Sequence, residues 1–309
     1  MRLLILSRSL SIHSTRRLAE AARARGHRVR VVDPARCELL MAGASTHLYH
    51  RRKRIAHVDA VIPRIAESLT NYGLAVLEHF SLRGVPVLND TSAVAQARNK
   101  LRCLLALSSH GIPVPATVMA RDAGDIKEMI DLVGGTPVLI KILRSGEKAG
   151  VMVCESVQSM SAALEAVLGL GHNLIVQQYV RGGGGKDLRA LVVGGRVIAA
   201  VRRRTRPGQL ARTLGKGARL EQVRLSDEQE RLAVESARVI RLEVAAIDMI
   251  EVKGKTQVFE VNASPGLKDL EAAVGRDLAT PIVLLAERRA GVAPDVESPR
   301  RASLASRGQ

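Results

Sequence analysis

Short apolar runs alternate with longer mixed segments over the first ninety residues of the chain. The runs, which are typical of short buried strands, lie at 3–6, 29–32, 60–62 and 85–88. The segments at 14–25 and 72–83 predict helices, and each is followed by a glycine of the kind that ends a helix. This alternation predicts a parallel sheet covered by helices.

A longer helix is predicted at 92–110, and Pro113 and Pro115 mark a boundary after it. Beyond this boundary, helices and strands alternate in a pattern that suits small α+β units. The predicted helices lie at 125–132, 161–168, 226–242 and 278–289. The predicted strands lie at 137–143, 151–154, 174–180, 188–193, 197–201, 244–252 and 257–261.

Composition narrows the class of protein. The chain has 309 residues, of which 46% are hydrophobic, so about two domains and a sizeable core are expected. No apolar run approaches the ~18 residues that a membrane span needs, and no secretory signal is recognisable, so we expect a cytoplasmic protein without membrane contact. Three cysteines without a Cys-x-x-Cys pair argue against a zinc site or a disulfide framework.

The net charge of +17 indicates attraction to polyanions. It favours either a nucleic-acid binder or an enzyme whose substrate is acidic or lies on an RNA-rich particle. Aromatic residues make up only 2% of the chain, which argues against stacking on single-stranded nucleic acid. No helix-turn-helix or RNA-binding signature accompanies the basic residues. A basic surface without a specific partner is the remaining alternative.

Oxygen-bearing side chains alternate with apolar residues near the end of the predicted fold. Glu260 and Asn262 are two positions apart on one strand and therefore share a face. A three-residue hairpin at 253–255 places Asp248 directly opposite Glu260. Two carboxylates this close repel each other unless a cation lies between them, and Mg²⁺ takes such ligands. The pattern predicts a metal site; the alternative is a solvated strand face.

Two lysines and one loop indicate phosphate binding. Lys141 lies in an otherwise apolar strand, where an ammonium is costly unless an anion pairs with it. Lys100 lies in the helix before the boundary, and the small residues of the loop at 144–151 let backbone N–H groups approach phosphate oxygens. The alternatives are lysines whose stems cover apolar surface, and a plain hairpin loop.

The segment around the glycine-rich loop at 181–186 carries further candidates. Gln178 and Tyr179 end a strand whose backbone can hydrogen-bond an adenine, and Asp187 suits a ribose hydroxyl. Three arginines on the following hairpin are suited to neutralise charge that develops during phosphoryl transfer. They are Arg189, Arg202 and Arg203. A plain strand and an exposed basic face are the alternatives.

Together these residues resemble the signature of the ATP-grasp ligases. Asp248 followed by Glu260-Val261-Asn262-Ala263-Ser264-Pro265-Gly266 is similar to the metal-binding motif of that family. Lys100 and Lys141 fall where the family has its two nucleotide lysines, and Gln178 and Tyr179 fall at its adenine-binding linker. Stretches at 3–8, 59–65 and 95–100 resemble the RimK family within this class, and the similarity extends over about residues 1–289.

The resemblance implies an α/β architecture of an α+β grasp type. A pre-ATP-grasp domain with a parallel sheet is expected at 1–95, a central ATP-grasp lobe at 96–180 and a C-terminal lobe with the metal site at 181–291. A disordered tail is expected at 292–309.

The resemblance also implies an ADP-forming ligase that uses ATP and Mg²⁺ or Mn²⁺, with the metal held by Asp248, Glu260 and Asn262. Arg189 and Arg202 are the implied catalytic residues. Ala211, Arg212 and Thr213 stand where the family has Arg-Ser-Asn contacts to the nucleotide. A substrate carboxylate attacks the γ-phosphorus, and the amine of L-glutamate then attacks the acyl phosphate.

The implied acceptor is the C-terminus of a small-subunit ribosomal protein, close to ribosomal RNA, and the implied enzyme is a homo-oligomer. Two alternatives stay open. The first is a ligase of the same fold that acts on a small-molecule acid. The second is a nucleotide-responsive ribosome-binding protein with weak or no turnover.

Overall fold

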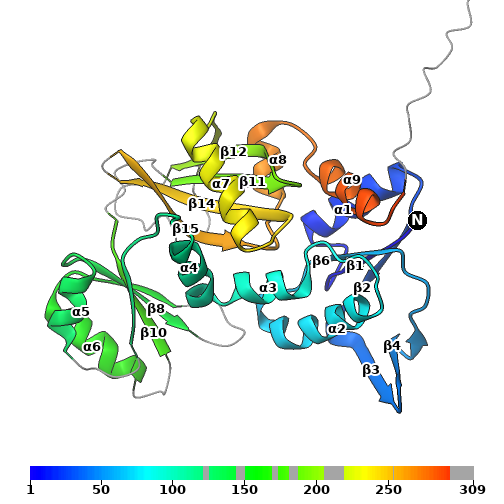
Figure 1. The fold of residues 1–309 in the computed structure, drawn as a ribbon, viewed down its shortest axis with the longest axis horizontal. Coiled ribbons are helices and arrows are strands. Elements are labelled where there is room, and N and C mark those ends of the chain that lie inside the picture. Colours follow the sequence, from blue (N-terminus) through cyan, green and yellow to red (C-terminus); the bar gives the residue numbers. More distant parts are fainter. Residues whose placement is uncertain are drawn as a thin grey trace, which may run out of the picture.

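The computed structural model describes residues 1–120, 125–143, 150–168, 173–180, 187–204, 219–252 and 254–292. The predicted disordered tail lies outside these ranges from residue 293 onward. No helix in the described ranges is both long and apolar enough to cross a membrane. Figure 1 shows the middle of the chain as a separate lobe, while the N-terminal and C-terminal parts lie side by side.

The N-terminal part contains the predicted parallel sheet. In sheet order its strands are β2 (Arg28–Val32), β1 (Arg2–Leu6) and β6 (Ala60–Pro63). Its helices are α1 (His13–Ala24), α2 (Thr70–Leu82) and the 3-10 helices η1 (Pro34–Arg36) and η2 (Glu67–Leu69). The predicted strand at 85–88 contributes a single bridge, from Val61 to Val87. Pro86 has no N–H to donate, which limits the ladder there.

A second, antiparallel sheet follows β2 and was not predicted. It contains β3 (Cys37–Ala42), β4 (Ser45–His50) and β5 (Lys53–Arg54). Figure 1 shows β3 and β4 projecting from the rest of the molecule. Cys37 and Leu48 are the buried residues of these strands. With so few buried positions, the segment lacks the apolar alternation that signals a strand.

The single helix predicted at 92–110 is two helices, α3 (Thr91–Arg98) and α4 (Lys100–Ser109). Asn99 separates them with an extended backbone, and its side-chain oxygen accepts a hydrogen bond from the backbone N–H of Arg102 at 3.0 Å. Asparagine is a preferred N-cap residue, so Asn99 ends one helix and starts the next. The break leaves Lys100 in the first turn of α4.

The middle lobe is an antiparallel four-stranded sheet with two helices on one face. Its strands, in sheet order, are β7 (Thr117–Ala120), β10 (Asn173–Gln178), β8 (Val138–Leu143) and β9 (Val151–Cys154). Its helices are α5 (Ile126–Leu132) and α6 (Val157–Leu168). The apolar side chains of Val138, Ile140 and Val176 share one cluster with both helices. Lys141 alternates with them and points to the opposite face.

The C-terminal part is built on a five-stranded antiparallel sheet. Its strands, in sheet order, are β13 (Arg219–Gln222), β12 (Arg196–Arg204), β11 (Asp187–Val193), β14 (Val244–Val252) and β15 (Lys255–Asn262). Its helices are α7 (Asp227–Val239), α8 (Lys268–Val274) and α9 (Ala279–Arg289).

Both faces of this sheet carry buried apolar residues. Ala190 and Ile247 belong to a cluster that also holds residues of α3, α4 and α7. Leu191 and Val201 belong to another cluster, which they share with Leu3 of β1. The N-terminal and C-terminal sheets therefore share a core, although about 180 residues lie between β1 and β11 in the sequence.

Asn89 connects the N-terminal part to the C-terminal sheet through a buried amide. Its Nδ2 donates to the carbonyl oxygens of Val244 at 2.7 Å and Ala263 at 3.1 Å. Its Oδ1 accepts from the backbone N–H groups of Glu243 and Val244, both at 2.8 Å. Four backbone groups thus depend on one side chain that is 1% exposed.

We expect Asn89→Ala to lower the free energy of unfolding by about 3 kcal/mol or more, because each buried polar group left unpaired costs ~1–3 kcal/mol. Urea denaturation followed by circular dichroism measures the loss. Ser226→Ala is the control, since it removes only the cap of α7 and is expected to cost ~1 kcal/mol. Equal losses in the two variants contradict the prediction.

Glu287 of α9 is held by two residues from the N-terminal part. Its carboxylate accepts from Arg25 at 2.5 and 2.8 Å and lies 2.6 Å from Nε2 of His27. The Glu287 side chain is 3% exposed. Burial raises the pKa of this carboxyl, but the bonds from Arg25 and His27 outweigh it and hold the pKa below its ordinary value of 4.5.

A carboxyl whose pKa is lowered by folding stabilises the protein above its unfolded pKa, and the stabilisation is lost as the pH falls through the folded pKa. We therefore expect Glu287→Gln to lower the free energy of unfolding at pH 7. The difference from the wild type should begin to shrink as the pH falls below about 4.3, where the unfolded chain becomes protonated, and should vanish below the lower pKa of the folded state. Urea denaturation across this pH range measures it. The exposed Glu235→Gln is the control and is expected to change stability little at any pH.

Candidate active site on the C-terminal sheet

The register of three neighbouring strands brings the predicted metal ligands together. Arg189 on β11 lies opposite Asp248 on β14, and Asp248 lies opposite Glu260 on β15. The predicted pairing of the two carboxylates is therefore found. The predicted hairpin is wrong in detail, because Val252 pairs with Lys255 and leaves two residues between them. A β-bulge between Asp248 and Met249 restores the pairing by adding one residue to β15.

Asp248 is buried between two arginines. Its side chain is 2% exposed, and it accepts from Nε and Nη2 of Arg189, both at 2.6 Å. Nη2 of Arg203 lies 2.8 Å from Oδ1 of Asp248, the oxygen that also accepts from Nε of Arg189. Burial raises the pKa of Asp248, but Arg189 first and then Arg203 hold it below its ordinary value of 3.8. The carboxylate is consequently ionised and fixed in one orientation.

Glu260 and Asn262 are more accessible. The Glu260 side chain is 37% exposed, and its Oε1 accepts from Nζ of Lys100 on α4 at 3.4 Å. Oδ1 of Asn262 accepts from the backbone N–H of Ser264 at 2.8 Å, which shapes the turn after β15. One buried carboxylate, one accessible carboxylate and one amide oxygen therefore lie along a single face of β14 and β15.

This donor set fits a divalent cation that prefers oxygen. Mg²⁺ takes one or two carboxylates, with phosphate oxygens and water completing its shell. Each carboxylate oxygen has two lone pairs, so Asp248 keeps capacity beyond its bonds to arginine. Within the described ranges no group of three or more histidine, cysteine or acidic side chains is suited to hold a metal. A site on this face depends on a nucleotide to complete it.

Of the remaining predicted nucleotide residues in the described ranges, Lys141, Gln178 and Tyr179 lie in the middle lobe, and Asp187 lies on the C-terminal sheet. Lys141 on β8 is 7% exposed and lies on the sheet face away from α5 and α6. Gln178 ends β10, and its backbone N–H donates to the carbonyl oxygen of Ala116 at 2.8 Å. Tyr179 follows it and is partly buried. Asp187 begins β11 opposite Arg203 and is 5% exposed.

The side chains of Arg202 and Arg203, near the end of β12, point to opposite faces of the sheet. Arg203 lies on the face of Asp248, whereas the strand alternation directs Arg202 to the opposite face. The structure therefore places Arg203, not Arg202, against the buried carboxylate, and Arg202 does not join this cluster. A regular hairpin turned by Gly194 and Gly195 would pair Asp187 with Arg202. The register shift between Leu191 and Val192 pairs Asp187 with Arg203 instead, so alternation along the sequence could not have shown this. Ala211, Arg212 and Thr213 lie outside the described residues, as does most of the predicted phosphate loop.

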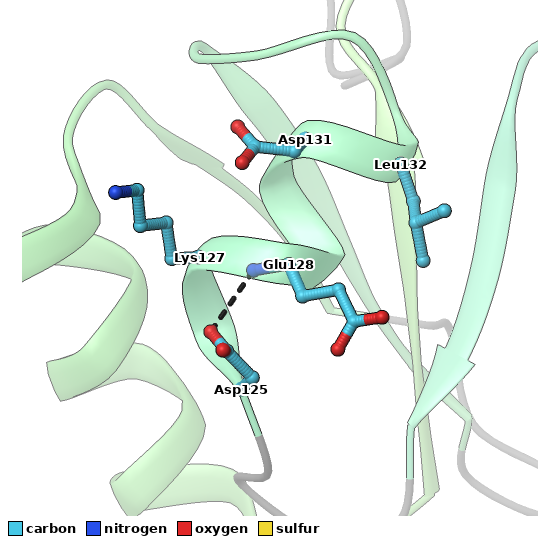
Figure 2. A pocket seen from close by; sticks show the side chains of 5 residues that line it. All are labelled: Asp125, Lys127, Glu128, Asp131 and Leu132. Atoms are coloured by element: carbon cyan, nitrogen blue, oxygen red, sulfur yellow. Dashed lines mark hydrogen bonds between the residues drawn. The ribbon is translucent and has the colours of Figure 1, made fainter.

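A hollow on the middle lobe is separate from these residues. Its volume is about 400 Å³. Figure 2 shows the side chains that line it, which come from α5 and its N-cap. Its lining contains none of the predicted site residues and consists of Asp125, Lys127, Glu128, Asp131 and Leu132. The three carboxylates make it a poor site for a polyphosphate.

Comparison with known proteins agrees with this arrangement over most of the chain. A model of the RimK-like ATP-grasp domain matches residues 97–285, and a model of the RimK PreATP-grasp domain matches residues 1–94. A relative from Aeromonas salmonicida named probable alpha-L-glutamate ligase is 40% identical over 290 residues, which cover 94% of this chain and 97% of the relative. A relative of the same name from Thioalkalivibrio sulfidiphilus is 41% identical and covers 94% and 96% of the two chains.

Solved structures show the same fold at lower identity. The ATP-grasp ligase PsnB complexed with a minimal precursor superposes with a TM-score of 0.72 at 23% identity, over 93% of this chain and 98% of PsnB. A RimK domain ATP-grasp protein from Sphaerobacter thermophilus gives a TM-score of 0.72 at 21% identity, over 93% and 99% of the two chains.

Fold and site together define an ATP-grasp enzyme, which is an ATP-dependent carboxylate–amine ligase. Within that class, the chain belongs to the RimK family. The predicted fold class and the predicted family are both confirmed.

Asp248 is buried and Glu260 is accessible, so substitutions at the two positions should differ in their effect on the free energy of unfolding. We expect Asp248→Asn to lower the free energy of unfolding by about 3–5 kcal/mol, because it leaves two arginine charges without their buried counterion. Glu260→Gln removes only an accessible pair with Lys100 and should cost less than about 1 kcal/mol. Urea denaturation of both variants without nucleotide measures this. A loss for Glu260→Gln as large as that for Asp248→Asn contradicts the prediction.

Proposed function

We propose that this protein is an ATP-dependent L-glutamate ligase that adds glutamate to the C-terminus of a small-subunit ribosomal protein in the cytoplasm. The observation that carries the proposal is the row of Arg189, Asp248 and Glu260 across three strands, with Lys100 reaching Glu260 from α4. The relatives that match nearly the whole chain are named probable alpha-L-glutamate ligases, which supports glutamate as the amine substrate.

In this proposal, Asp248, Glu260 and Asn262 hold Mg²⁺, which supplies charge neutralisation at the phosphates when bound; Mn²⁺ has the same preference for oxygen ligands. Arg189 and Arg203 keep Asp248 ionised and oriented. The residues assigned to ATP are Lys100, Lys141, Gln178, Tyr179, Asp187, Ala211, Arg212 and Thr213. Arg202 keeps its predicted catalytic role as a proposal, although its strand position directs it away from Asp248.

The proposed reaction has two steps. A carboxylate oxygen of the acceptor attacks the γ-phosphorus, the bond to ADP breaks, and an acyl phosphate forms. The amine of glutamate then attacks the acyl carbon, phosphate leaves, and the nitrogen loses a proton. The contribution of the protein is to position both substrates and to stabilise developing charge.

The net charge of +17 supports an acceptor that lies close to ribosomal RNA, because a basic surface attracts a polyanion without specific contacts. A closed homo-oligomer is the expected assembly. The names of the relatives do not specify an acceptor, so a ligase for a small-molecule acid is the second outcome that the experiment has to distinguish.

We expect release of ADP that requires Mg²⁺, glutamate and the ribosomal protein together, and intact-mass spectrometry of the acceptor should show increments of one glutamate residue. Glu260→Gln should slow turnover by about 10²–10³-fold, as loss of one electrostatic stabiliser typically does. Because this variant is expected to remain folded, it separates chemistry from stability.

Two other outcomes contradict the proposal. Turnover with a small acid and none with the ribosomal protein favours the small-molecule ligase. Nucleotide binding with steeply salt-dependent RNA association, and no turnover with any acceptor, favours a ribosome-binding protein.

A further inference from the structure

Arg64 lies at the carboxyl end of β6, directly after Pro63. Its backbone N–H donates to the carbonyl oxygen of Leu6, the last residue of the neighbouring β1, at 2.8 Å. In open sheets with parallel strands, ligands bind in the crevice outside the carboxyl ends of the strands. Arg64 thus occupies the edge of the N-terminal sheet where a ligand is expected.

The Arg64 side chain crosses to the C-terminal part of the molecule. Its Nη2 donates to the carbonyl oxygen of Pro265 at 2.7 Å. Pro265 belongs to the turn that follows β15, and Asn262 shapes that turn through its bond to Ser264. Arg64 therefore reaches from the N-terminal sheet to within three residues of a proposed metal ligand.

The charge of Arg64 has no acidic counterpart in the described parts of the chain. Its side chain donates to a neutral carbonyl oxygen, and a second arginine, Arg98, lies nearby and donates to the carbonyl oxygen of Ile65. Burial, and then the charge of Arg98, lower the pKa of Arg64 to about 10. Two other arginines of this molecule behave differently, since Arg189 and Arg203 both contact the carboxylate of Asp248.

Arg64 is partly buried, and withdrawing a cation from water is costly unless an anion compensates it. A guanidinium has five N–H donors in a planar fork that matches a carboxylate, and one carbonyl oxygen uses only part of that fork. An external carboxylate would supply a compensating charge and acceptors for the rest of the fork.

We infer that Arg64 binds a carboxylate of the amino acid that donates the amine, at the junction of the N-terminal sheet with the turn after β15. The inference rests on the proposed ligase function and adds the location of the donor site. The donor keeps its carboxylates unchanged through both steps, so a fixed, partly buried cation can hold one of them from binding to release. The acceptor carboxylate is instead consumed, and it must reach the phosphates.

The test compares wild type, Arg64→Met and Arg64→Lys with three amine donors: L-glutamate, its α-carboxamide and its γ-carboxamide. For wild type, one of the two carboxamides should raise the donor KM about 100-fold, which identifies the carboxylate that is bound. Arg64→Met should raise the KM for glutamate by about the same factor and should no longer distinguish glutamate from that carboxamide. Arg64→Lys, which keeps the charge without the fork, should fall between them.

The KM for ATP and the melting temperature distinguish a loss of donor binding from a general loss of structure. Both should stay within about twofold or a few degrees of wild type if Arg64 contacts the donor. A purely structural Arg64 would change kcat, stability and all substrates together and would leave the preference among donors intact, which would overturn the inference. Arg83→Met, an exposed position at the end of α2, is the matched control and should behave as wild type.

Failure of the inference about Arg64 can be distinguished from failure of the proposed function. If wild type uses a donor other than glutamate, the proposed substrate is wrong, and the same comparison with the carboxamides of that donor tests Arg64. If no donor supports turnover, calorimetric titration of L-glutamate into protein loaded with a non-hydrolysable ATP analogue provides the test. Equal affinity of wild type and Arg64→Met, or no binding to wild type, overturns the inference.

Discussion

The ion pairs of the buried Asp248 carboxylate are the interaction on which the arrangement of the candidate site depends. A carboxylate that is 2% exposed stays ionised only because Arg189 and Arg203 surround it. The two arginines also fix its orientation, so that it faces Glu260 across one strand pair. Neither arginine has to contact a substrate to contribute. Each keeps the Asp248 carboxylate ionised at a buried position, where water cannot stabilise its charge.

The site is assembled from parts that are distant in sequence. Glu260 comes from β15, its partner Lys100 comes from the first turn of α4, and Arg64 reaches the following turn from β6. The N-terminal part is held against the C-terminal sheet in two ways: by the core that Leu3 shares with Leu191 and Val201, and by the side-chain amide of Asn89. The same packing that stabilises the fold therefore positions the groups of the candidate site, and loss of either contact would disturb both.

Much of the fold and of the site was accessible from the sequence, with instructive exceptions. The pairing of Asp248 with Glu260 was predicted through a hairpin of the wrong length, and a bulge compensated the error. The break between α3 and α4 at Asn99 was missed, because the helical spacing of the sequence continues across it. Asparagine can also cap a helix, and here its side chain caps the start of α4. The sheet of β3, β4 and β5 was missed because its packing buries too few residues to leave an apolar pattern.

The sequence by itself determined most of the helices and strands, the alternation of side chains along each strand and the carboxylate–amide pattern of Asp248, Glu260 and Asn262, because these are properties of neighbouring residues. Only the tertiary structure decided which arginine faces Asp248, that Lys100 meets Glu260, and that Arg64 ends beside Pro265. Such contacts join residues up to about 200 positions apart, and no local periodicity encodes them. Burial then sets the strength of the ion pairs among these contacts, because water would screen the same charges at the surface.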